Sequence, residues 1–230
     1  AVALLEEAER LILEISQKKT RDGFVSIRTI LLKTFDKIEY LYANKGNLTG
    51  VPTHFKELDR ITSGLQPSDL VIIAARPSMG KTAFVLNIAQ NAAVKSNIPV
   101  AFFSLEMSKE QLVQRMLCSE AMVDQQRVRT GELLGSDWPK LTQAVGPLAE
   151  APIYIDDTVG ISLAELRSKA RRLKMERGLG LIIIDYLQLM TVGKRTESRQ
   201  QEVAQISRGL KGVARELAVP VVALSKLNRG

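Results

Sequence analysis

Ala75-Arg76-Pro77-Ser78-Met79-Gly80-Lys81-Thr82 carries the strongest signal in this chain of 230 residues. It follows the apolar run Leu70–Ala74 and precedes a helical pattern over Ala83–Ala93. A strand, a tight loop and a helix in this order direct backbone N–H groups and the positive end of the helix dipole at an anion. We therefore predict that residues Ala75 to Thr82 bind the phosphates of a nucleotide.

Three residues of this loop have specific expected roles. Lys81 reaches the β- and γ-phosphates, and the Thr82 hydroxyl ligates Mg²⁺. Gly80 allows the closest approach of the backbone to the phosphates. The general pattern has glycine where Ala75 stands, so the match to that pattern is incomplete. The strand before the loop and the helix after it favour the phosphate site over a chance match.

Length and composition indicate one α/β domain with an appendage. No apolar run approaches the roughly 20 residues of a membrane helix, and the first residues are acidic and amphipathic, unlike a signal peptide. The single cysteine, Cys118, excludes an internal disulfide, which fits a reducing cytoplasm. His54, the only histidine, cannot form a histidine-based metal site alone. We therefore expect a cytoplasmic protein without membrane contact whose only metal is the nucleotide's Mg²⁺.

The net charge of the chain indicates what kind of partner it binds. A formal net charge of +7 favours a polyanionic partner. An aromatic content of 5% argues against a platform on which bases stack. If nucleic acid binds, we expect backbone contacts from Lys, Arg and main-chain amides to dominate.

Two segments before residue 49 have helical periods. Residues 2–17 and 26–45 are separated by the polar break 18–23, and Gly46 is a suitable stop after the second segment. The second segment has a single apolar stripe, made by Ile27, Ile30, Leu31, Phe35, Ile38, Leu41 and Tyr42. It either packs back on the core or docks on a neighbouring subunit, and the pattern alone favours neither.

From Leu70 onward, apolar runs alternate with helical patterns. We predict strands over residues 70–75, 100–105, 153–156, 181–186 and 219–225, and helices over 82–95, 109–119, 163–177 and 199–217. Strands that are apolar on both faces and separated by helices indicate a parallel sheet covered on both sides. The ligand then binds at the carboxyl ends of the strands.

Polar residues follow three of these strands. Asp185 ends an apolar run and is suited to hold Mg²⁺, directly or through water. Glu106 is suited to orient and deprotonate the water that attacks the γ-phosphate. Ser225 or Lys226 would sense the γ-phosphate. Each also has a structural alternative, since such residues often cap a strand end or begin a turn or helix.

Four motifs together resemble those of the DnaB-type bacterial replicative helicases. They are Ala75–Thr82, Phe-Ser-Leu-Glu-Met at Phe103–Met107, Ile-Asp-Tyr-Leu-Gln-Leu-Met at Ile184–Met190, and Arg-Gln-Gln-Glu-Val-Ala-Gln-Ile-Ser-Arg at Arg199–Arg208. The resemblance covers nearly the whole chain, and Ala75 is the residue that this family commonly has. It implies a RecA-like P-loop NTPase core, with a parallel sheet covered by helices, after an α-helical linker.

The resemblance also implies an organisation and partners. Residues 1–22 would end a helical N-terminal region, 23–48 would be a linker helix that docks on the adjacent subunit of a hexameric ring, and 49–230 would form the motor domain. The positions matching Lys81, Thr82 and Asp185 contact phosphate and Mg²⁺ in that family, and Glu106 matches its catalytic carboxylate. ATP, Mg²⁺, single-stranded DNA, a primase and a helicase loader are the implied ligands and partners.

Two departures from the family are visible. The family usually carries Gln where this chain has Lys226, and a cation would not orient water as an amide does. The chain also stops at Gly230, before the region of the family's arginine finger and second DNA-binding loop, so we expect a fragment.

Two basic segments are candidates for contact with DNA. The loop after Met190 offers Lys194, Arg195 and Arg199, although it could equally be a solvated basic loop. The basic helix over 163–177 is interpreted as an ordinary charged outer face.

The leading functional hypothesis is an ATP-driven, DNA-unwinding motor of the replication fork. A recombinase-like filament that holds DNA is the first alternative, because the same core serves both. A nucleotide-gated docking platform without motor activity is the second.

Overall fold

The computed structural model describes residues 24–191 and 198–227. The predicted helix over residues 2–17, and with it the segment 1–22, lies outside the described residues, as do Lys194 and Arg195. The chain divides into two compact units, residues 1–47 and 48–230.

The described part of the smaller unit is one helix, α2, over Ile27–Ala43. Ser26 caps its first turn, because the Ser26 side chain accepts a hydrogen bond from the Thr29 backbone N–H at 3.4 Å. The helix ends at Asn44, and Gly46 follows with a φ of +92°. None of the 17 residues of α2, all of which the structure describes, is buried. The apolar stripe seen in the sequence therefore adds nothing to a core within this unit.

The larger unit is built on a five-stranded parallel sheet in the order β1-β5-β4-β2-β3. Its elements, in chain order, are α3 Lys56–Thr62, β1 Leu70–Ala75, α4 Lys81–Gln90, the π-helix Asn91–Lys95, β2 Val100–Ser104, α5 Lys109–Ala121, α6 Gln125–Thr130, α7 Asp137–Glu150, β3 Ile153–Asp156, α8 Leu163–Arg177, β4 Leu181–Asp185, the 3₁₀ turn Leu187–Leu189, α9 Arg199–Leu217 and β5 Val221–Lys226.

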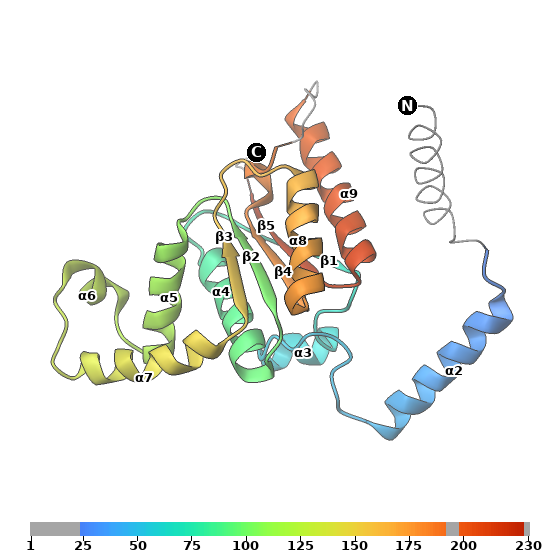
Figure 1. Ribbon diagram of the computed structural model, residues 1–230, viewed down its shortest axis with the longest axis horizontal. Coiled ribbons are helices and arrows are strands. Elements are labelled where there is room, and N and C mark those ends of the chain that lie inside the picture. Colours follow the sequence, from blue (N-terminus) through green and yellow to red (C-terminus); the bar gives the residue numbers. More distant parts are fainter. Residues whose placement is uncertain (1–23, 192–197, 228–230) are drawn as a thin grey trace, which may run out of the picture. The chain divides into compact units, whose positions relative to one another are not determined.

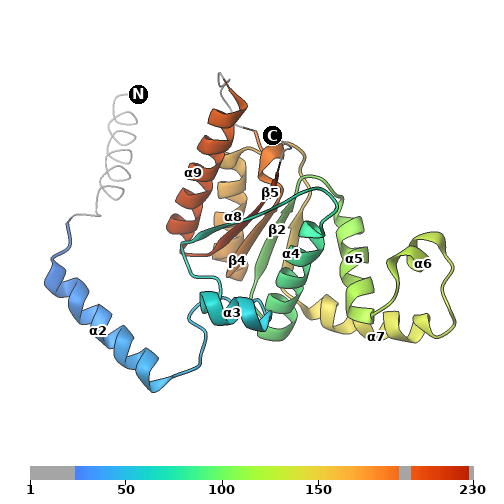
Figure 2. The same ribbon diagram turned by 180° about the vertical axis from the view of Figure 1, so that it is seen from behind.

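The order of the strands explains the layers. From β1 to β2 to β3 the chain moves across the sheet in one direction, and from β3 to β4 to β5 it moves back. Right-handed crossovers then place the first connecting helices on one face and the later ones on the other. Helices α8 and α9 lie in front of the sheet in Figure 1, and α4 lies in front when the molecule is seen from behind in Figure 2.

Each face of the sheet has its own core. Leu166 and Leu210, from α8 and α9, pack with Ile182 and Ile184 of β4 on one face. On the other face, α4 and α5 pack against Leu181 and Ile183. The central strands β2 and β4 are buried along their whole length, as the sequence predicted for a sheet covered on both sides.

That expectation is wrong for the edge strands. Ile72 in β1 is 45% exposed, whereas Val71 and Ile73 pack into the core on the opposite face. Tyr154 in β3 is 36% exposed. Both are edge strands of the sheet, and the described helices leave these two side chains partly exposed.

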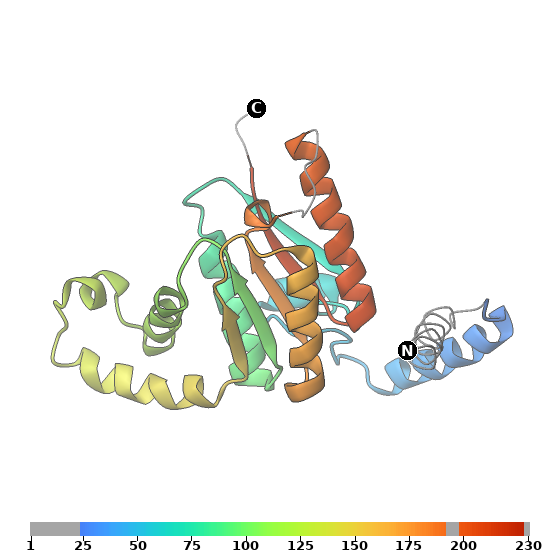
Figure 3. The ribbon, with the colours of Figure 1, turned by 45° about the horizontal axis from the view of Figure 1, so that its top comes forward.

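Three helices have no counterpart in the sequence-based prediction: α3, α6 and α7. Helices α5, α6 and α7 lie together at one side of the sheet (Figure 3). They enclose a small separate core of Ala121, Val123, Leu141 and Ala144. Helices α3 and α6 span only seven and six residues, and α7 contains Pro147, a residue that usually interrupts a helix. Cys118 is buried in α5.

Candidate active site

The loop between β1 and α4 has the shape of a phosphate cradle. Ser78 and Gly80 have φ angles of +64° and +81°, and the Phe84 N–H donates to the Gly80 carbonyl at 2.9 Å as the helix begins. A Cβ built on Gly80 would meet no atom within 4 Å, so the backbone conformation, not lack of space, favours glycine. The exposed loop and the first N–H groups of α4 can therefore receive an anion.

Lys81 connects this loop to the end of β5. Its ammonium donates to the Ser225 carbonyl at 2.8 Å. Strand register explains the contact, because Ala75 at the end of β1 pairs with Lys226 at the end of β5. Burial, followed by the nearby charge of Lys226, lowers the pKa of the Lys81 ammonium. Two cations therefore lie beside the phosphate loop.

Thr82 and Asp185, the two predicted magnesium ligands, are in contact. The Thr82 hydroxyl donates to Asp185 Oδ2 at 2.9 Å. Asp185 is only 2% exposed at the end of β4, and burial raises the pKa of its carboxyl. A hydroxyl and a carboxylate are oxygen donors of the kind that Mg²⁺ prefers, and substrate phosphates and water usually complete its octahedron. In the described part of the chain, no group of three or more His, Cys, Asp or Glu side chains is placed to hold a metal ion.

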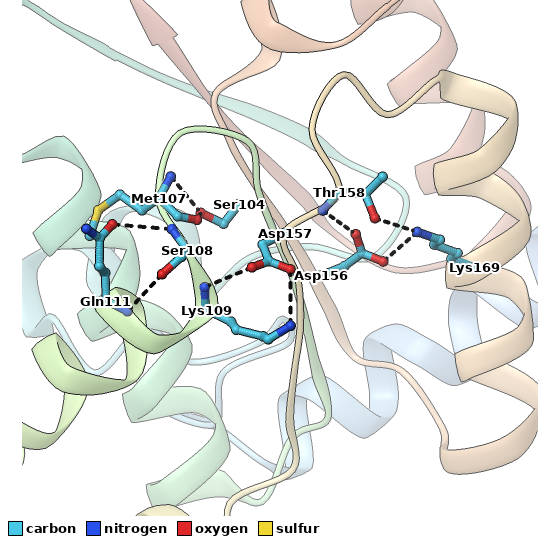
Figure 4. Close-up of polar contacts among 9 residues, drawn as sticks. All are labelled: Ser104, Met107, Ser108, Lys109, Gln111, Asp156, Asp157, Thr158 and Lys169. Atoms are coloured by element: carbon cyan, nitrogen blue, oxygen red, sulfur yellow. Dashed lines mark hydrogen bonds and ion pairs between the residues drawn. The ribbon is translucent and has the colours of Figure 1, made fainter.

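Glu106 lies just beyond the end of β2. Ser104, the last residue of β2, pairs with Asp185 in the sheet, which brings the two strand ends together. The Ser104 hydroxyl donates to the Met107 carbonyl at 2.6 Å and accepts from the Met107 N–H at 3.3 Å (Figure 4). These bonds form a tight turn that presents the half-exposed Glu106 side chain at the same edge of the sheet as Asp185.

The other end of this turn is also anchored. Ser108 and Gln111 form a capping box at the start of α5, with side-chain-to-backbone bonds of 3.4 and 3.3 Å. The Lys109 N–H donates to the Asp157 carboxylate, which follows β3, at 3.2 Å (Figure 4). The loop that carries Glu106 is therefore held from β2, α5 and the end of β3.

Lys226 lines the cavity at the end of β5 and contacts the predicted catalytic carboxylate. Its ammonium is 3.1 Å from Glu106 Oε1 and 3.9 Å from the centre of the Tyr186 ring. The Tyr186 side chain and the Glu106 carboxylate raise the pKa of Lys226. The cavity has a volume of about 450 Å³ and is lined by residues from the phosphate loop, the start of α4, the turn after β2, α5 and the end of β5: Pro77, Ser78, Gly80, Lys81, Thr82, Ala83, Glu106, Met107, Arg115 and Lys226.

Sequence reasoning missed two residues of this site. Arg115 lines the cavity from α5, and its buried Nε atom has no hydrogen-bond partner among the described residues. Gln188 donates to the Ser225 hydroxyl at 2.7 Å and accepts from the Lys226 N–H at 3.4 Å, which joins the loop after β4 to the end of β5. The signal for Arg115 was a single arginine between apolar residues of a helix that begins just after Glu106.

Of the predicted DNA-binding residues, only Arg199 is described. It begins α9, pairs with Glu202 and donates to the Gln188 carbonyl. Arg199 therefore contacts the loop that follows β4 and Asp185. The basic residues of α8 are partly matched by acids: Arg167 and Arg171 lie against Glu216, and Arg172 against Glu176.

Known proteins of similar sequence cover nearly the whole chain. "Replicative DNA helicase DnaC" of Bacillus subtilis (strain 168) is 58% identical over 228 residues, which are 99% of this chain and 50% of that protein. "Replicative DNA helicase DnaB" of Geobacillus stearothermophilus is 59% identical over 227 residues, 98% of this chain and 50% of that protein. The chain thus spans about half the length of these curated relatives.

Solved structures share the fold. One whose title describes an ATPase domain superposes with a TM-score of 0.84 at 40% identity, covering 90% of this chain and 73% of that one. Another, titled "The Structure Of A DnaB-Like Replicative Helicase And Its Interactions With Primase", has a TM-score of 0.81 at 39% identity and covers 97% of this chain and 54% of that one. Residues 50–230 match the family described as "DnaB-like helicase C terminal domain". The chain therefore belongs to the family of DnaB-like helicase C-terminal domains.

Proposed function

We propose that this chain is the ATP-hydrolysing part of a replicative DNA helicase, which couples hydrolysis to movement along single-stranded DNA and to separation of the duplex. The observation that carries the proposal is the convergence of the phosphate loop, the Thr82–Asp185 pair and Glu106 on one edge of the sheet. The names of the relatives favour this function over a recombinase filament or a docking platform without motor activity.

Each side chain has a role in this proposal. The loop Ala75–Thr82 binds the triphosphate, and Lys81 leaves the Ser225 carbonyl to bind the β- and γ-phosphates. Thr82 and Asp185 hold Mg²⁺, which would neutralise phosphate charge when bound. Glu106 accepts a proton from the attacking water. Ser225 or Lys226 senses the γ-phosphate, and of the two Lys226 lines the cavity.

The proposed partners follow from the relatives and from the chain's charge. Single-stranded DNA is held largely through its backbone by basic residues, including Arg199 and the predicted Lys194 and Arg195, in a sequence-independent and salt-dependent manner. Helix α2 docks on the next subunit of a hexameric ring, and a neighbouring subunit supplies an arginine to the γ-phosphate. A solved relative interacts with primase, and we propose a primase and a loader as partners in the cytoplasm. No helix in the described parts of the chain is long and apolar enough to cross a membrane.

The direct test compares ATP turnover and strand separation in Lys81→Ala, Glu106→Gln and the wild-type protein. Lys81→Ala should lose nucleotide affinity and turnover together. Glu106→Gln should keep nucleotide affinity, while turnover falls by roughly 10²–10⁴-fold. Glu110→Gln is the matched control, since this acid lies in the first turn of α5 and does not line the cavity. Near-normal unwinding by Glu106→Gln would refute the role assigned to this carboxylate.

A further inference from the structure

Lys226 makes contacts that a phosphate sensor alone does not require. Its ammonium lies 3.1 Å from the Glu106 carboxylate, so the proposed base is paired with a cation. A carboxylate that is paired with an ammonium is a weaker base towards water than an unpaired carboxylate. The same ammonium lies over the Tyr186 ring at 3.9 Å, a second contact that stabilises this position.

The backbone of Lys226 is held, whereas its side chain can exchange partners. Pairing with Ala75 of β1 and the bond from the Lys226 N–H to Gln188 fix the main chain. The ion pair with Glu106 is partly exposed, with side-chain exposures of 31% for Lys226 and 46% for Glu106. Exposed ion pairs contribute little to stability. A rotamer change at the tip of the lysine is therefore enough to break the contact.

We propose that Lys226 is a latch on Glu106 that opens only for a nucleoside triphosphate. In the absence of nucleotide the ammonium holds the carboxylate. A γ-phosphate in the cavity offers three oxygens and a larger negative charge than the carboxylate, so it draws the ammonium away and frees Glu106. A diphosphate lacks this group and leaves the latch closed. This inference rests on the proposed function, because it presumes that the cavity binds ATP.

The first test measures the affinity of the whole chain for Mg²⁺–ADP and for a Mg²⁺ complex of a non-hydrolysable ATP analogue. Lys226→Gln should weaken binding of the triphosphate analogue by about tenfold, and change ADP binding by less than about twofold, because the lost charged contact is made only to the γ-phosphate. Lys226→Arg keeps the cation and should keep the preference for the triphosphate.

Lys211→Gln is the matched control, because Lys211 also pairs with a carboxylate, Asp69, but at the opposite end of the strands. It should leave both affinities unchanged. Equal weakening of ADP and analogue binding in Lys226→Gln, or no change in either, would overturn the latch.

The second test observes the latch itself. The chain has four tyrosines, so labelling with 3-fluorotyrosine gives few ¹⁹F signals, and Tyr186→Phe identifies the one from Tyr186. The triphosphate analogue should shift this signal as the ammonium leaves the ring, whereas ADP with the same metal should not. In Lys226→Gln neither nucleotide should shift it. A signal that responds equally to ADP and to the analogue contradicts the latch.

These outcomes separate the two proposals. Retained ADP affinity without any difference between the nucleotides removes the latch and leaves the nucleotide site in place. Absence of affinity for both nucleotides in the wild-type chain removes the nucleotide site and, with it, the latch.

Discussion

Asp185 combines deep burial with a charge that the proposed function needs. It is 2% exposed, and the described hydrogen bond to its side chain comes from the Thr82 hydroxyl. Burial raises the pKa of Asp185 above the ordinary value of 3.8, so the folded state binds this proton more tightly than the unfolded state. The resulting penalty is absent below the unfolded pKa and complete once pH rises above the folded pKa. The bound metal would offset it.

The cost of burying the ionised Asp185 carboxylate gives a prediction for Asp185→Asn. Without metal at neutral pH, the variant should be more stable than the wild type by on the order of 1 kcal/mol, and the gain should shrink as pH falls towards 3.8. Urea unfolding at several pH values measures it. The variant should also lose Mg²⁺-dependent nucleotide turnover. Asp69→Asn, at an exposed site, is the control and should change stability little. A loss of stability in Asp185→Asn at neutral pH would contradict this account.

Two glycines of α9 face α8 with different amounts of space around them. A Cβ on Gly209 would lie 2.0 Å from Leu163 Cδ2 and 3.1 Å from its Cγ, whereas a Cβ on Gly212 would meet only Arg167 Nη2 at 3.8 Å. Both glycines lie inside α9, where alanine is preferred by about 1 kcal/mol. The two substitutions therefore differ only in the space available.

We predict opposite signs for these two variants. Gly212→Ala should stabilise the protein by up to about 1 kcal/mol through helix propensity. Gly209→Ala should destabilise it by roughly 1–3 kcal/mol, because Leu163 must move out of its packed position. Thermal unfolding of both variants measures the difference. Equal stabilisation by both would show that α8 adjusts freely to the added methyl group.

The end of β3 is tied to α8 by an ion pair. Lys169 Nζ lies 2.7 Å from Asp156 Oδ2, and the Thr158 N–H donates to the same carboxylate at 3.0 Å (Figure 4). Burial alone would raise the pKa of Asp156, but the bonds from Lys169 and Thr158 outweigh burial and lower it below 3.8. The stabilisation is therefore present above the unfolded pKa and is lost as pH falls through the folded pKa.

Asp156→Asn should accordingly lower the free energy of unfolding at neutral pH by about 0.5–1 kcal/mol, a modest figure because both side chains are partly exposed. The difference should disappear in acid. The difference in free energy of unfolding between Asp156→Asn and the wild type should stay constant at mildly alkaline pH. The reason is that Lys169 remains charged there, because its pKa is raised above 10.5. Denaturant titrations across this range measure it. Arg172→Gln, which breaks an exposed pair with Glu176 within α8, is the control and should have a smaller effect. A penalty that persists in acid would assign the effect to packing.

At the scale of the whole molecule, we assign folding stability to the larger unit and the proposed assembly to helix α2. No residue of α2 is buried, and its apolar stripe is of the kind that docks in a groove of a partner. Removing residues 1–47 should therefore change the free energy of unfolding of the remaining unit by less than about 0.5 kcal/mol, while abolishing assembly. Chemical denaturation and light scattering measure the two effects. Phe35→Ser should weaken assembly, and Asp36→Ser, on the side of α2 opposite the stripe, should not. Assembly that persists after the deletion would contradict the proposed docking of α2.

Much of the fold and of the site could be predicted because the signals are local. The phosphate loop needs a strand, a positive φ at glycine and a helix N-terminus, all encoded within Leu70–Ala93. Asp185 and Glu106 could be placed at one edge because the carboxyl ends of parallel strands always meet there. Helices α3 and α6 were missed because they are short, and α7 was missed because Pro147 and Gly146 are residues that usually interrupt a helix.

Periodicity and loop chemistry within single segments thus specified the parallel sheet, its phosphate loop and the acids at its edge. The strand order, the exposure of Ile72 and the entry of Arg115 into the cavity came from packing between segments. So did the pairing of Lys226 with Glu106, which are 120 residues apart in the chain. The reason is physical: a side chain's partner depends on strand register and crossover direction, and these are set by the free energy of burying all the elements together.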